Sequence, residues 1–130
     1  TNPYLMIERQ DSSLHEVSGI SEVWAKDDSF IVGVASETLH EEDQELYQAV
    51  CDAISEAINL INTDKEEAAK FTYELDGNSL DEEIAYMEDG TYSVETTGIF
   101  DLAKFMSEAG FIDKAPEAYT DLVFDNVSGN

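Results

Sequence analysis

The sequence predicts an α/β fold that is rich in helices and poor in strands, with one main strand at residues 29–36 and four to five helices. Two observations lead to this prediction. Residues 30–35 form a short apolar run with β-branched side chains, which is typical of a strand buried on both faces. From residue 41 onward, apolar side chains recur at three- and four-residue steps, which is the pattern of amphipathic helices.

Composition indicates one modest globular domain. Of the 130 residues 42% are apolar, and the aromatic content is ordinary, which argues against disorder despite the charge. Thirty acidic residues against six basic ones give a net charge of −24. This charge repels phosphate backbones and anionic membranes, so we expect no nucleic-acid partner. Solubility, export or a salt-tolerant host would each account for such acidity.

The first elements along the chain are short. Thr1 or Asn2 can cap a helix that begins at the following proline. A weak strand is predicted at residues 14–17, and residues 19–26 are expected to be irregular. The main strand then follows.

A long amphipathic helix is predicted at residues 41–62. Acidic residues fill its first turns, where the helix dipole favours them. Its apolar stripe consists of Tyr47, Val50, Ile54, Ile58 and Ile61.

Sequence signals divide the second half into further helices. A capping box at residues 63–66 starts one that ends at Gly77, and a second box at residues 79–82 starts one that ends by Gly90. A threonine at 96 or 97 caps the next.

That helix ends at Gly110, followed by Phe111 as in a Schellman ending. A last short helix is predicted at residues 116–122.

No catalytic residue is predicted. The single cysteine, Cys51, falls beside Val50 and Ile54, so we expect a buried, inert thiol. His15 and His40 are far apart in the sequence and have no metal-ligand spacing. We expect both imidazoles to be exposed or hydrogen bonded.

A calcium loop at residues 76–83 is the alternative to helix capping there. An EF-hand requires an oxygen donor at its fifth position and glycine at its sixth, but Leu80 and Asp81 stand at these places. We therefore prefer capping, and predict neither a metal site nor a cofactor.

Several motifs occur in a recognisable order. The run FIVGVAS at residues 30–36 precedes a helix with Ala-Val-x-x-Ala-Ile-x-x-Ala-Ile at residues 49–58. Glu-Glu-Ala-Ala follows at residues 66–69, and a Glu-Ala-Gly turn at residues 108–112, while Asn-Pro-Tyr opens the chain at residues 2–4. Together they resemble the C-terminal part of substrate-binding proteins of ABC importers, in the nitrate/sulfonate/taurine and thiamine-pyrimidine-precursor group.

This resemblance implies a partial type 2 periplasmic-binding-protein fold. Residues 1–28 would form the end of the second lobe and the hinge crossing, and residues 29–130 the C-terminal portion of the first lobe. The parent protein would bind a small solute between its lobes outside the cytoplasm and deliver it to ABC permease subunits. No catalytic activity is implied.

The resemblance also suggests where the solute would bind. Thr1, Asn2 and Tyr4 would begin a helix facing the cleft, where backbone N–H groups suit anionic solutes. Trp24 would form one aromatic wall. The alternatives are that the first residues only cap a helix and that Trp24 packs at the lobe junction.

A single strand cannot complete a sheet by itself. We therefore expect residues 30–35 either to pair with a second copy of the chain or to leave their edges exposed, and the isolated chain to bind solute weakly. The alternative function is an acidic helical protein-interaction domain without a small-molecule ligand.

Overall fold

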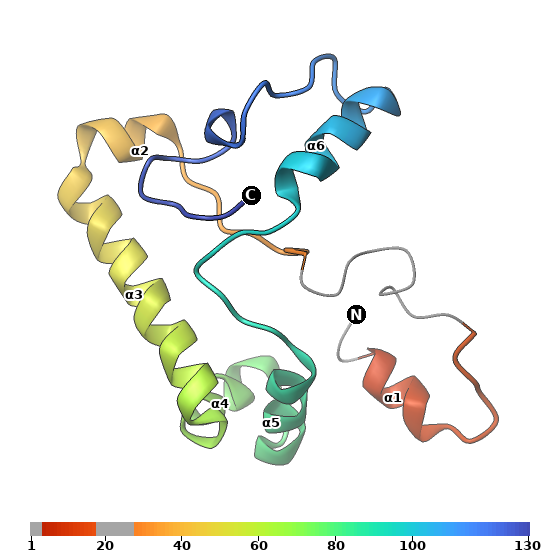
Figure 1. Ribbon diagram of the computed structural model, residues 1–130. Coiled ribbons are helices and arrows are strands. Elements are labelled where there is room, and N and C mark those ends of the chain that lie inside the picture. The colour runs from red at the N-terminus through yellow and green to blue at the C-terminus, as the bar shows by residue number, and fades with distance from the viewer. Residues whose placement is uncertain (1–3, 18–27) are drawn as a thin grey trace. The chain divides into compact units, whose positions relative to one another are not determined.

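The computed structural model describes residues 4–17 and 28–130, and Figure 1 shows that helices dominate these residues. Contacts divide the chain into two compact units, which are described separately below. Unit one comprises residues 1–24 and 57–92, and unit two comprises residues 25–56 and 93–130. The helical elements are α1 Tyr4–Gln10, α2 Glu37–Glu42, α3 Gln44–Thr63, α4 Lys65–Asp76, α5 Leu80–Asp89, α6 Ile99–Glu108 and the 3₁₀ turn η2 Tyr119–Asp121.

The prediction of a main strand at residues 29–36 is wrong for this structure. These residues are irregular, and the side chains of Ile31 and Val34 are 86% and 92% exposed. β-Branched residues favour an extended backbone, but a strand also needs neighbouring strands for its N–H and C=O groups. Within the described residues the only β-bridge joins Thr96 to Gly129, so no sheet is available. The weak strand predicted at residues 14–17 is likewise irregular.

The long helix begins later than predicted, because a separate helix precedes it. The Ser36 hydroxyl caps α2 by accepting from the Leu39 N–H at 3.2 Å. Asp43 ends α2, since its N–H donates to the Leu39 carbonyl at 3.2 Å. The Asp43 carboxylate then caps α3 by accepting from the Leu46 N–H at 3.1 Å. One aspartate thus separates the two helices.

Capping also determines where α4 and α5 begin. The carboxylate of Asp64 caps α4 by accepting from the Glu67 N–H at 2.9 Å, so the capping box predicted around Thr63 is replaced by a simpler cap. The second predicted box is confirmed: the Ser79 hydroxyl accepts from the Glu82 N–H, and the Glu82 carboxylate accepts from the Ser79 N–H at 2.8 Å.

Two glycines end helices as the sequence predicts. Gly77 follows α4 with φ 74°, and Gly110 follows α6 with φ 78°, a left-handed conformation that glycine adopts without a Cβ clash. The Phe111 N–H donates to the Met106 carbonyl at 2.8 Å and the Gly110 N–H to the Ser107 carbonyl at 3.1 Å. These two bonds confirm the Schellman ending of α6.

The core of unit one forms where α4 packs against α5 and the end of α3. Ala68 and Ala69 on α4 and Met87 on α5 are buried, and small alanines allow close helix approach. The partly buried side chains around them are Leu60, Ile61, Leu80 and Ile84.

In unit two, the last residues pair with the segment before α6. The Thr96 N–H donates to the Ser128 carbonyl at 3.1 Å, and the Asn130 N–H donates to the Thr96 carbonyl at 3.0 Å. The N–H of Gly98 donates to the Asn130 side-chain oxygen at 3.0 Å. Gly98 is the residue that precedes α6, so the predicted threonine cap of this helix is wrong. Gly129 has φ 146°, and any Cβ there would collide with the Thr96 carbonyl. The helix predicted at residues 116–122 is reduced to η2.

Candidate functional site

Of the predicted solute-binding residues, only Tyr4 can be located. It is the first residue of α1, and its side chain is 69% exposed. Thr1, Asn2 and Trp24 lie outside the described residues. The solute site proposed from the sequence therefore remains a prediction.

A cluster of rings in unit two is the first candidate site found in the structure. His40 on α2 stacks in parallel on Phe124, with ring centroids 4.1 Å apart. Tyr47 on α3 meets both rings edge-on, at 4.8 Å from His40 and 5.6 Å from Phe124. The C-terminal segment is thereby joined to α2 and α3.

Polar contacts extend this ring cluster. The Tyr47 hydroxyl donates to the Asn126 side-chain oxygen at 2.8 Å, and the Asn126 amide lies 3.7 Å from the Cys51 sulfur. His40 Nε2 lies 3.7 Å from an Asp125 carboxylate oxygen. Burial raises the pKa of the Tyr47 phenol, and the neighbouring Cys51 thiol raises it further. The phenol therefore stays protonated at neutral pH and serves as a hydrogen-bond donor.

The space beside the ring cluster is small. Its volume is about 190 Å³, below the roughly 300–1,000 Å³ typical of ligand pockets. The ring cluster therefore fastens one segment to two helices and offers little room for a solute. The residues lining it are His40, Gln44, Tyr47, Gln48, Asp125 and Asn126.

Sequence reasoning missed the ring cluster. His15 is exposed as expected, whereas His40 is largely covered, with 26% of its side chain exposed. Nothing near His40 in the sequence indicates contact with Phe124, which lies far along the chain. The prediction that Cys51 is buried is wrong, because the residue is partly exposed.

A second hollow, of about 550 Å³, lies along residues 112–122 in the segment after α6. Three of its charged side chains already have partners within the segment. Lys114 Nζ lies 2.9 Å from a Glu117 carboxylate oxygen, and the Asp121 carboxylate accepts from the N–H groups of Glu117 and Ala118. These backbone bonds lower the pKa of Asp121. These contacts stabilise the turn.

A buried carboxylate is the main polar feature of unit one. Glu83 on α5 is 6% exposed, and its oxygens accept from the Thr72 hydroxyl at 2.7 Å and the Asn78 amide at 2.8 Å. Burial raises the pKa of the nearby Tyr92 phenol, and the negative charge of Glu83 raises it further. Because both oxygens are bonded to neutral groups of the same helical pair, this network stabilises α4 against α5.

The part of the chain that the structure describes offers neither a metal site nor a membrane span. There, no three His, Cys, Asp or Glu side chains gather in a way that could hold a metal ion. None of the described helices has the length and apolar content required to span a bilayer.

Comparison with known proteins gives no relative. No protein-family model, curated protein or solved structure matches this chain. Any functional conclusion therefore depends on the residues themselves and their arrangement.

Proposed function

We propose that this chain is part of the solute-binding component of an ABC importer with a type 2 periplasmic-binding-protein fold. The parent protein would hold a small organic or inorganic solute non-covalently between two lobes, outside the cytoplasm, and deliver it to permease subunits. Closing and opening about a hinge would control capture and release. In this proposal residues 1–28 end the second lobe and residues 29–130 belong to the first.

The observation that carries the proposal is the structural role of the motif residues. Ala68 and Ala69 of the Glu-Glu-Ala-Ala motif are both buried where α4 packs on α5. The Glu-Ala-Gly motif lies at the Schellman ending of α6 around Gly110. The residues that suggest the family are therefore those that a shared helical framework would require.

Exposed apolar side chains give further support. Phe30, Ile31, Val32 and Val34 are all substantially exposed, although this composition favours burial. One lobe of a larger α/β protein would cover such a run with strands from other parts of the polypeptide. The helix-rich architecture of the described residues is compatible with the C-terminal portion of such a lobe.

The test is a thermal-shift screen of the full gene product against sulfonates, nitrate and pyrimidines. A ligand at one hundred times its Kd stabilises the native state by about 2.7 kcal/mol. For a protein of this class that raises Tm by roughly 5–10 °C. A gene that encodes no further lobe, or a folded product that none of these solutes stabilises, contradicts the proposal.

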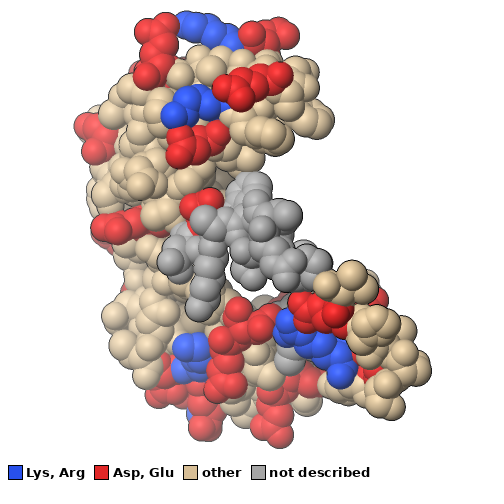
Figure 2. Space-filling model, turned by 45° about the vertical axis from the view of Figure 1, so that its right-hand side comes forward, with Lys and Arg blue, Asp and Glu red and all other residues tan. Residues whose placement is uncertain are grey.

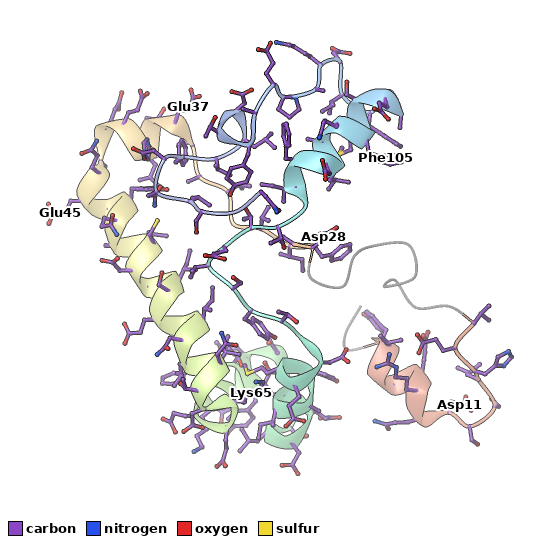
Figure 3. All side chains as sticks on the ribbon, viewed as in Figure 1. Asp11, Asp28, Glu37, Glu45, Lys65 and Phe105 are labelled. Carbon is purple, nitrogen blue, oxygen red and sulfur yellow. The ribbon has the colours of Figure 1, made fainter. Side chains whose placement is uncertain are left out.

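A second candidate function is an acidic protein-interaction domain. No Lys or Arg occurs from Glu37 to Thr63, and Glu37 and Glu45 point outward from α2 and α3 (Figure 3). Acidic residues also outnumber basic ones across the face in Figure 2. This function predicts tight binding of a lysine-rich peptide that weakens steeply between 50 mM and 500 mM salt, measured by calorimetry. The importer proposal predicts no specific peptide binding.

A further inference from the structure

A short motif in the last turn of unit two has the pattern of a covalent modification site. Residues 126–128 read Asn-Val-Ser, and no other asparagine in the sequence is followed two positions later by serine or threonine. Asn-x-Ser/Thr, with x other than proline, is the acceptor pattern of N-linked glycosylation. Because a glycan is bulky and hydrophilic, such a motif can carry one only where its asparagine lies at the surface.

The motif lies at an exposed turn. The Val127 N–H donates to the Phe124 carbonyl at 3.0 Å, which closes a β-turn. Asp125 and Asn126 stand at the centre of this turn, and 93% of the Asp125 side chain is exposed. Asn126 and Ser128 are exposed as well. A hydrophilic group attached to this turn therefore has solvent to extend into.

The oxygen and the nitrogen of the Asn126 amide have different contacts. Oδ1 accepts from the Tyr47 hydroxyl at 2.8 Å, whereas Nδ2 lies 3.7 Å from the sulfur of Cys51, which is a weak acceptor. An amide nitrogen carries two hydrogens, and the contact with sulfur uses at most one of them. Substitution at Nδ2 leaves Oδ1 an acceptor. The bond from Tyr47 can therefore persist in the modified protein and hold the attached group at the turn.

We propose that Asn126 is an N-glycosylation site, with Ser128 as the hydroxyl residue that the transferase recognises. The donor is an oligosaccharide linked through phosphate to a polyprenyl lipid. Nδ2 forms a C–N bond to the anomeric carbon of the first sugar, and the bond from that carbon to the phosphate oxygen breaks. The lipid phosphate leaves with the electron pair, and a base of the transferase takes one amide proton. The inference goes beyond the importer function and shares with it only the location outside the cytoplasm.

Peptide mapping by mass spectrometry of the protein from its native cells tests this inference. We expect the peptide that contains Asn126 to carry an oligosaccharide in most molecules and to lose it on treatment with an N-glycosidase. Ser128→Ala should abolish the modification, and Ser128→Thr should retain it. Alanine leaves the Ser128 carbonyl, which accepts from the Thr96 N–H, in place. An unmodified Asn126 in the wild type, or an equally modified Ser128→Ala variant, overturns the inference.

The Cys51 thiol provides a second readout. Because Nδ2 of Asn126 lies 3.7 Å from this sulfur, a sugar on Nδ2 would occupy space beside the thiol. Alkylation of Cys51 by a maleimide should be severalfold slower in the native wild type than in Ser128→Ala. The two proteins should react equally when both are made in a host without the transferase. Equal rates for the native pair contradict a glycan at Nδ2.

The thermal-shift screen of the same native product separates this inference from the importer function. A glycosylated protein that no solute stabilises refutes only the importer function. An unmodified protein that a solute stabilises refutes only the glycosylation site.

Discussion

Replacing Glu83 with alanine tests whether a buried carboxylate fastens α4 to α5. The side chain is 6% exposed and accepts hydrogen bonds from Thr72 at 2.7 Å and Asn78 at 2.8 Å. Hydrogen bonds to a charged group contribute about 1.5–3 kcal/mol each, so the two bonds contribute about 3–6 kcal/mol before compensation. Alanine also removes the unfavourable desolvation of a buried charge, which offsets part of the loss. We expect the free energy of unfolding to fall by about 2–3 kcal/mol.

The assay is urea denaturation followed by circular dichroism at 222 nm. Glu83→Gln keeps the shape of the side chain and one carbonyl acceptor. Its free energy of unfolding should therefore fall by less than half as much as that of the alanine variant. Glu88→Ala on the exposed side of the same helix is the matched control and should stay within about 0.5 kcal/mol of the wild type. The reasoning is refuted if the alanine variant is as stable as this control, or if the glutamine variant is less stable than the alanine variant.

Three further predictions concern other contacts. Tyr47→Phe removes the hydrogen bond to Asn126 and should lower the free energy of unfolding by about 1 kcal/mol in thermal melts; no change would show that this bond adds nothing. Hydrogen bonds from the Ser79 N–H and hydroxyl lower the pKa of Glu82 in the folded state. These bonds therefore stabilise the fold fully above the unfolded pKa, near 4.5, and the stabilisation is lost as the pH falls through the lower folded pKa. Glu82→Gln should reduce this acid dependence in urea melts, and an unchanged pH profile would contradict it. Because salt screens the repulsion between acidic chains, molar salt should promote self-association of the isolated chain in sedimentation runs. Val34→Lys, at a side chain that is 92% exposed, should prevent this association. A wild-type chain that stays monomeric at every salt concentration would contradict the prediction.

Local signals in the sequence predicted the helical part of the fold well. Ser79 and Glu82 form their box because both partners lie within one turn of helix. Gly77 and Gly110 end helices because glycine alone adopts the left-handed conformation without strain. These features depend only on neighbours along the chain, so one sequence suffices to identify them.

Features that need distant partners could not be predicted in this way. Residues 30–35 have strand composition, but a strand forms only where other strands supply hydrogen bonds. His40 is covered by Phe124 and Tyr47, and no spacing rule joins residues so far apart. The burial of Glu83 depends on the turn that brings Thr72 and Asn78 to it. The candidate solute residues Thr1, Asn2 and Trp24 stay untested predictions.

The double role of Asp43 has a consequence for local opening. Its N–H closes the last turn of α2 onto Leu39, and its carboxylate holds the free Leu46 N–H at the start of α3. When this residue moves, both helix ends lose a bond in the same event. Fraying at the two ends is therefore coupled, and the amide protons of Asp43 and Leu46 should exchange with solvent with similar opening free energies. The short break between α2 and α3 thus behaves as a single cooperative joint.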